Sequence, residues 1–407
     1  MAPTPWAYVS TQYIDNFKGR DIVIEVREVK TRKDIKEFIE LPLRLYKGNP
    51  CFVPPLYMDE KALFKKETVY TEQAESVFYI AKRDDKTLGR IQGILQRVSN
   101  EKWDQKRVRF TRFDCIDDQE VADALFSAVE NWAKERGMEE IVGPLGYSDL
   151  DREGLLVEGF DQLSTFEEQY NHPYYATLIE GAGFAKEIDW LEFKLTAPEV
   201  IDERYERISS MMLKKYGLRL GVAKNTRAFI KQWGDEFFDV LDETYVHIYQ
   251  SVPFTAKMKK NLIDNFKLIL NVNYATVILD KEDKIVGFGL ALPSIARAVQ
   301  KSGGRLTPAT IVRVLKAIKK PSVIDLALIG VIPEYQNKGI ASAIISEMLK
   351  MLSTGGIEYC ETNLNLETNT NIQNQWKAFE SEQHTRRRSF VKKIEFVKEN
   401  IYGTIYA

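Results

Sequence analysis

Two stretches of this 407-residue chain match each other at a constant distance, and this repeat restricts the possible folds more than any other feature. Ala122-Asp-Ala-Leu-Phe matches Ala341-Ser-Ala-Ile-Ile, and Gly137-Met-Glu-Glu-Ile matches Gly356-Ile-Glu-Tyr-Cys. One offset of 219 residues (341 − 122 and 356 − 137) relates both pairs, so no gap lies between them. A repeat of this length indicates duplication of one domain, and the length of the chain also favours two domains.

The hydrophobic pattern of each half has the same order: strand, helices, hairpin, strand, helix, strand, helix, strand. A Thr-Ala-Pro-Glu segment at 196–199 interrupts the pattern, so we expect domains at 1–197 and 204–407. The order predicts an α/β fold with a mixed sheet, in two tandem copies. The paired segments are strands at 22–29 and 218–223, helices at 34–46 against 226–233 and 237–249, hairpins at 78–96 and 275–292, and terminal helix–strand units at 171–195 and 371–394.

The segment 329–342 carries the strongest functional signal. An apolar strand at 323–331 runs into a short turn, and a helix begins near Gly339. Its apolar face consists of Ile340, Ile344, Ile345, Met348 and Leu349. Unpaired N–H groups and the helix dipole make such a helix N-terminus a site for a phosphate or pyrophosphate. Gly339 allows a ligand to approach the main chain closely.

The spacing Gln336-x-x-Gly339-x-Ala341, preceded by Val331-x-Pro333, resembles the acetyl-CoA loop of GCN5-related N-acetyltransferases (GNAT). The resemblance implies acetyl-CoA as co-substrate, with its pantetheine arm beside a splayed strand and its pyrophosphate on the loop. It also implies that an Asn begins the helix after the next strand and touches the cofactor. The implied cofactor-binding residues are Ile329, Val331, Gln336, Asn337, Lys338, Gly339, Ile340, Ala341, Ser342 and Asn371.

The first half lacks these features. At the register of Gly339 it carries Glu120, close to Asp117 and Asp118. Carboxylates cap a helix N-terminus well, but they would repel a pyrophosphate. We therefore expect a degenerate first copy that helps to shape the substrate cleft, with cofactor bound only by residues 204–407.

The strand after the cofactor helix is unusually polar. Glu361, Asn363, Asn365 and Glu367 alternate, so in an uninterrupted strand all four would lie on one face. Either this face lines a wet cleft, or the strand ends early and 363–370 is a loop. We expect Glu361 and Asn363 to be catalytic, with Glu361 as the base that takes the proton of the amine.

The general acid is less evident. The family resemblance implies a Tyr in the helix that begins near Asn371, but this stretch carries Trp376 and Phe379. Tyr335, Tyr359 and water remain alternatives for protonating the leaving thiolate.

Composition excludes several other classes. A formal net charge of −2 gives no reason to expect nucleic acid. The three cysteines and three histidines have no metal-ligand spacing, so no metal is expected. Residues 1–18 are polar and aromatic without an apolar segment, so we expect no leader there, and no run is apolar enough to span a membrane. We expect a cytoplasmic monomer or homodimer.

One basic segment stands apart from this balance. From Lys284 to Ile324 there are eight Lys or Arg residues and no Asp or Glu. Residues 297–320 could contact an anionic surface or wall a cleft for an anionic substrate, or could simply form a solvated helix face.

Together these features predict an acyl-CoA-dependent N-acyltransferase that moves an acyl group, with acetyl as the default, to the amine of a small molecule. Transfer would be direct, within a ternary complex. The alternatives are a CoA-binding protein without turnover, an enzyme for longer acyl chains, and a Fem-like transferase. The Fem-like alternative is disfavoured because its aminoacyl-tRNA donor has no use for a pyrophosphate loop.

Overall fold

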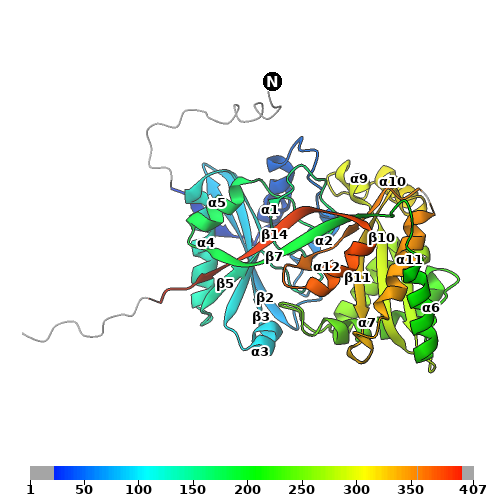
Figure 1. Ribbon diagram of the computed structural model, residues 1–407. Helices are drawn as coiled ribbons and strands as arrows, with labels where there is room; N and C mark the ends of the chain where they lie inside the picture. Colours follow the sequence, from blue (N-terminus) through cyan, green and yellow to red (C-terminus); the bar gives the residue numbers. More distant parts are fainter. Residues whose placement is uncertain (1–22, 355, 397–407) are drawn as a thin grey trace, which may run out of the picture.

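One continuous mixed sheet passes through both halves of the chain (Figure 1). The computed structural model describes residues 23–354 and 356–396, and in this part the sheet has fourteen strands. The predicted α/β fold in two tandem copies is confirmed. Ile22 of the first predicted strand, and residues 1–18, where we expected no leader, lie outside the described ranges.

The first half follows the predicted order of elements. In sequence these are β1 (Glu25–Glu28), α1 (Arg32–Leu45), α2 (Tyr57–Ala62), β2 (Ala74–Arg83), β3 (Lys86–Gln96), α3 (Arg97–Trp103), β4 (Arg107–Cys115), α4 (Gln119–Lys134), β5 (Glu140–Gly143), β6 (Leu155–Glu158), α5 (Tyr174–Gly181) and β7 (Ala185–Thr196).

The second half repeats this order with insertions. Its elements are α6 (Arg204–Tyr216), β8 (Arg219–Leu220), α7 (Thr226–Tyr245), α8 (Ala256–Ile269), η1 (Val272–Tyr274), β9 (Ala275–Leu279), β10 (Ile285–Pro293), α9 (Ala296–Gln300), α10 (Pro308–Lys319), β11 (Val323–Val331), η2 (Pro333–Tyr335), α11 (Ala341–Ser353), β12 (Tyr359–Thr362), β13 (Asn365–Leu366), α12 (Thr370–Gln375), η3 (Trp376–Ala378) and β14 (Glu380–Lys393).

The two halves exchange their last strands. β14 lies between β5 and β7 of the first half, and β7 in turn pairs with β12 of the second half. Figure 1 shows β14, in red, running beside β7 toward the first half. Main-chain hydrogen bonds therefore join the two predicted domains, and both copies share the centre of one sheet.

The helices of the second half differ from the prediction. We expected two helices here, at 226–233 and 237–249. The structure has one helix, α7, which continues through Gly234. Gly234 is buried, and a Cβ there would approach Ile230 and, from α8, Ile263. The glycine thus lies inside α7, and a Cβ there would be in ordinary van der Waals contact with α8. The prediction also missed α6, which packs against α11.

The predicted basic insertion forms α9 and α10. Thr307 caps α10, since its side chain accepts a hydrogen bond from the Thr310 N–H. The buried side of α10 carries Val314 and Ile318, which belong to a cluster that also contains Phe166 and Ile269. This insertion also contacts the first half, where Arg305 pairs with Glu40 at 2.9 Å.

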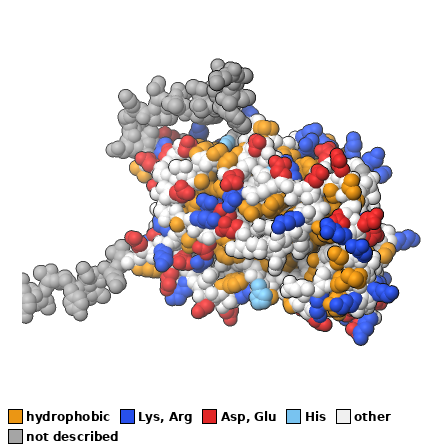
Figure 2. Space-filling model, in the orientation of Figure 1, with side chains coloured by type: hydrophobic (Ala, Val, Ile, Leu, Met, Phe, Trp, Pro, Cys, Tyr) orange, Lys and Arg blue, Asp and Glu red, His pale blue; other side chains and the backbone are white. Residues whose placement is uncertain are grey.

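The outer side of α10 is both apolar and basic. Ile311, Val312 and Leu315 are 46%, 66% and 59% exposed, and exposed Lys316 and Lys319 lie among them. In Figure 2, Lys and Arg side chains gather near the edge where Figure 1 places α9 and α10. Of the helices in the described ranges, none is both long enough and apolar enough to cross a bilayer.

Candidate functional site

The N-terminus of α11 is open to a ligand. Ile340 precedes the helix, and no side chain caps its first N–H groups. The loop before it needs two left-handed residues, Asn337 (φ 57°) and Gly339 (φ 72°), a conformation that glycine adopts without strain. The Gln336 side-chain amide donates to the Val331 carbonyl at 2.9 Å and closes the loop. The predicted strand, turn and uncapped helix N-terminus are therefore present, and anion binding there stays a prediction.

Next to this loop, β11 separates from β12. The two strands pair in parallel from Val323↔Tyr359 to Leu326↔Thr362, and the Asn363 N–H then donates to the Leu326 carbonyl at 3.1 Å. β11 continues alone to Val331. The gap leaves one edge of β11 without a partner strand.

Side chains satisfy the carbonyl groups along this open edge at every second residue. The Asn363 amide donates to the Ala327 carbonyl at 3.4 Å. The Tyr245 hydroxyl donates to the Ile329 carbonyl at 3.3 Å and accepts from its N–H at 3.4 Å. The Gln336 amide donates to the Val331 carbonyl at 2.9 Å. A ligand with its own amide groups could replace such contacts, since each is worth only about 1 kcal/mol net.

The loop and the gap open into one cavity of about 780 Å³. Of the residues predicted from the sequence, the following line it: Ile329, Val331, Gln336, Asn337, Gly339, Ile340, Ala341, Asn363 and Asn371. Lys338 instead lies with its ammonium 5.1 Å from the Tyr335 ring, and the Ser342 hydroxyl donates to the Gly339 carbonyl at 2.5 Å.

Glu361, the predicted base, lies in different surroundings. Its carboxylate is 3.1 Å from His384 Nε2, and it lines a second, very small cavity together with Glu192 and Arg387. The reason is the end of β12 at Thr362. Because the chain bends there, Asn363 and Asn365 line the main cavity, whereas Glu361 lines the smaller one.

Much of the main cavity is apolar. The wall is formed by α7, α8, the adjacent strands and two loops of the first half, through Leu150, Phe166, Trp190, Ile248, Leu262, Phe266, Ile269, Leu292 and Leu328. These residues carry no motif, so sequence reasoning missed them. Tyr245 was missed for the same reason. Burial raises the pKa of the Tyr245 hydroxyl, which therefore stays protonated.

The first half contributes acidic side chains to the same cavity. They come from the loops before and after β6: Asp149, Asp151, Glu153, Glu167 and Glu168. Burial is the main cause that raises the pKa of Asp149 to about 6 and the pKa of Glu168 to about 8. The acidic run from 149 to 153 was a visible signal, but nothing in the sequence tied it to a site nearly 200 residues away.

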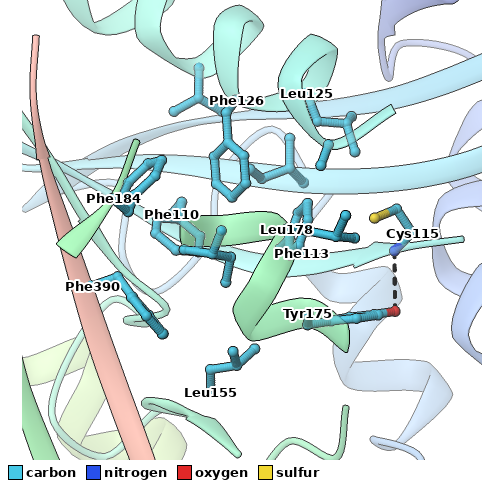
Figure 3. Packing of buried hydrophobic residues seen from close by; sticks show 14 of the residues in the cluster. Phe110, Phe113, Cys115, Leu125, Phe126, Leu155, Tyr175, Leu178, Phe184 and Phe390 are labelled. Atoms are coloured by element: carbon cyan, nitrogen blue, oxygen red, sulfur yellow. Dashed lines mark hydrogen bonds between the residues drawn. The ribbon is translucent and has the colours of Figure 1, made fainter. Parts of the chain in front are cut away.

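The equivalent site of the first half is closed. Asp118 caps α4 by accepting hydrogen bonds from the N–H groups of Glu120 and Val121. On β4, the Cys115 N–H donates to the Tyr175 hydroxyl at 3.1 Å, and the Tyr174 hydroxyl donates to the Cys115 carbonyl. Figure 3 shows Tyr175 against Cys115, among packed aromatic rings. A ligand would have to displace the chain's own core there.

Comparisons with known proteins agree with this geometry. Residues 234–375 match the acetyltransferase (GNAT) family. A tandem GNAT protein from the clavulanic acid biosynthesis pathway has a similar structure, with a TM-score of 0.56 at 11% identity over 92% of this chain and 99% of that chain. Residues 234–375 therefore form a GNAT domain, and the whole chain has the fold of a tandem GNAT protein. A GNAT domain supports acyl transfer as the general class of activity.

Two curated proteins match this tandem GNAT chain over most of its length. Protein YghO of Escherichia coli (strain K12) is 28% identical over 91% of this chain and 95% of that protein. A bacterial ceramide synthase of Caulobacter vibrioides is 25% identical over 79% of this chain and 83% of that protein. These relatives cover both GNAT copies.

Proposed function

We propose that this protein is an N-acyltransferase that binds acyl-CoA through its second GNAT copy and acylates the amine of an amphiphilic small molecule. The observation that carries the proposal is the uncapped N-terminus of α11, which opens into the same cavity as the unpaired edge of β11. The pyrophosphate would bind the N–H groups of residues 336–342, and Asn371 would lie beside the cofactor.

The acyl group in this proposal is longer than acetyl. An acetyl group would leave the apolar wall of α7 and α8 without a partner, whereas burying apolar surface contributes about 25 cal/mol per Å². Cavities of this size and lining typically hold largely apolar ligands. The similarity to a ceramide synthase also supports an acyl group longer than acetyl.

In the transfer step, the neutral amine attacks the thioester carbon, a C–N bond forms and the C–S bond breaks. The nitrogen loses a proton, and the CoA thiolate gains one. Main-chain N–H groups of β11 around Val331 would stabilise the developing oxyanion. We assign the proton for the thiolate to Tyr245, because its protonated hydroxyl lies on the open edge of β11.

An amphiphilic acceptor would reside at a lipid surface, and the outer side of α10 fits such a surface. Its exposed apolar residues could enter the headgroup region while its lysines contact anionic lipids. The buried side of α10 packs with Phe166 and Ile269, which also line the cavity. We therefore propose an anionic bilayer as the surface that α10 contacts.

Release of free thiol tests the function. The intact protein is mixed with acetyl-CoA, octanoyl-CoA or dodecanoyl-CoA and a panel of primary amines, and thiol is measured with a chromogenic disulfide. We expect amine-dependent release that is faster with the longer donors. Tight CoA binding without release from any pair would contradict catalysis and favour the alternative, a CoA-binding protein without turnover. Faster release with acetyl-CoA would contradict the proposed chain length.

A further inference from the structure

Three residues of the first half that line the main cavity each carry one buried carboxyl oxygen without a hydrogen-bond partner. Glu153 and Glu168 are only 4% and 3% exposed. Glu153 Oε1, Glu168 Oε2 and Asp149 Oδ1 are buried and form no hydrogen bond, and all three residues line the cavity. Buried polar atoms normally have partners, so such a group requires an explanation.

The neighbouring arginines do not satisfy these carboxyl oxygens, because their N–H groups donate to other acceptors. Arg109 donates to the Gly146 carbonyl at 3.0 Å, and to Ser99 and Gln250 at 2.7 and 2.8 Å. Arg387 is closer to Glu192, at 3.2 Å, than to Glu168, at 3.8 Å. Arg152, which also lies near Glu168, donates to the Phe166 carbonyl at 3.2 Å. In the described part of the chain, no hydrogen bond joins these three arginines to Asp149, Glu153 or Glu168.

The charge around these groups is mainly negative. The neighbours of Glu153 include Asp149, Asp151 and Glu168, with Arg109 opposing them. Burial, and then Asp149, raise the pKa of Glu153 well above its usual range. Asp151 differs, since it accepts hydrogen bonds from the Tyr147 N–H and the Tyr70 hydroxyl. A bound cation would offset the repulsion among Asp149, Glu153 and Glu168 and give a partner to the one unsatisfied oxygen of each.

A divalent metal ion does not fit. Among residues 23–354 and 356–396, no three His, Cys, Asp or Glu side chains lie in an arrangement that could hold one. An ammonium group fits better, since it offers three donors on a small cation and needs no fixed coordination geometry. The apolar wall beside the carboxyl groups would accommodate a hydrocarbon chain attached to it.

We infer that Asp149, Glu153 and Glu168 bind the primary ammonium group of the acceptor, with its apolar chain beside Leu150 and Phe166, the apolar lining of the cavity that lies next to these residues in the sequence. This inference rests on the proposed function and defines the acceptor as a cationic, amphiphilic primary amine. The second copy would hold the acyl donor, while the first copy, whose own cofactor site is filled, would recognise the acceptor.

The site also accounts for the protons. The ammonium group R–NH₃⁺ passes one proton to a carboxylate of the cluster, and R–NH₂ attacks the thioester. The amide nitrogen then loses its second proton, and the thiolate takes up one. The sum is ammonium plus acyl-CoA giving amide, CoA thiol and one released proton. Asp149, with a pKa of about 6, is ionised at neutral pH and can accept the first proton.

A pair of matched probes tests the site: n-octylamine, which is cationic, and 1-octanol, which has the same chain and no charge. Binding to the intact protein is measured by calorimetry. We expect n-octylamine to bind at least about tenfold more tightly than 1-octanol, since ion pairs in a buried site strengthen binding. The variant Glu153→Gln/Glu168→Gln should lower the affinity for the amine at least about tenfold and leave that for 1-octanol unchanged.

Asp161→Asn is the control, because Asp161 lies in the same loop as Glu168 but is exposed. It should change neither affinity. Asp149→Asn replaces the double variant if that protein does not fold, with the same expected pattern. Equal binding of the two probes by the wild type, or an equal loss of both in the variant, would overturn the inference.

The inference and the proposed function can fail separately. Thiol release from acyl-CoA that persists with unchanged amine dependence in Glu153→Gln/Glu168→Gln would reject this acceptor site and leave the function intact. Selective binding of n-octylamine at the cluster, with no thiol release from any acyl donor, would reject the function and leave the site.

Discussion

Tyr245 and Ile329 form two hydrogen bonds with each other across the open edge of β11: the hydroxyl donates to the carbonyl and accepts from the N–H. This contact brings the C-terminal end of α7 to the gap between β11 and β12. The first half uses Tyr174 and Tyr175 in a comparable way on β4, but there Tyr175 is part of a packed core (Figure 3). In the second half the hydroxyl lines a cavity.

We expect Tyr245→Phe to lower kcat for acyl transfer by about 10²-fold while changing the affinity for CoA less than about threefold, because the ring packing remains and only the proton donor is lost. Single-turnover thiol release and calorimetry measure the two quantities. Tyr335→Phe is the control, since Tyr335 lines the cavity from the loop side. A Tyr245→Phe enzyme with unchanged kcat would assign protonation of the thiolate to water.

The raised pKa of Glu168 predicts that the stability of the protein depends on pH. Its pKa is raised from 4.5 to about 8, chiefly by burial, so the folded state binds more protons than the unfolded state between these values. The free energy of unfolding should therefore fall as pH rises through this window, and Glu168→Gln should remove part of the fall, on the order of 2 kcal/mol. Denaturant unfolding at pH 5 and pH 8 measures the difference. If the free energy of unfolding falls as much between pH 5 and pH 8 in Glu168→Gln as in Asp161→Asn and the wild type, the raised pKa that burial gives this carboxyl would be contradicted.

The outer side of α10 predicts lipid binding. We expect the intact protein to sediment with vesicles that contain anionic phospholipid and much less with zwitterionic vesicles. Val312→Asp/Leu315→Asp should abolish the sedimentation and leave the melting temperature unchanged, because both side chains are exposed. Val222→Asp, at an exposed apolar residue far from α10 in the sequence, is the control. Equal sedimentation of the wild type and both variants with both vesicle types would argue against a specific lipid-contacting helix.

The sequence predicted the fold well because the repeat and the hydrophobic pattern are local signals. The strand, turn and helix around Gly339 could be placed for the same reason, and the structure brings Gly339, Asn363 and Asn371 to one cavity. Cofactor binding by these residues stays a prediction.

Other features depend on how distant segments meet. The alternation at Glu361 and Asn363 predicted one shared face, but β12 ends at Thr362 and separates their directions. Glu153 and Tyr245 reach the cavity only because the two halves share one sheet and α7 lies against it. No local pattern encodes that arrangement, and the exchange of β7 and β14 has no local signal either.

The central claim, that acyl-CoA binds at the N-terminus of α11, is tested most directly by titrating CoA into Gly339→Glu in a calorimeter. Gly339→Ala is the matched control, since it adds the same backbone strain at φ 72° and the same contact near Met212 without a charge. We predict no detectable CoA binding by Gly339→Glu, binding by Gly339→Ala within about tenfold of the wild type, and similar melting temperatures for both variants. Wild-type affinity for CoA in Gly339→Glu would contradict the account.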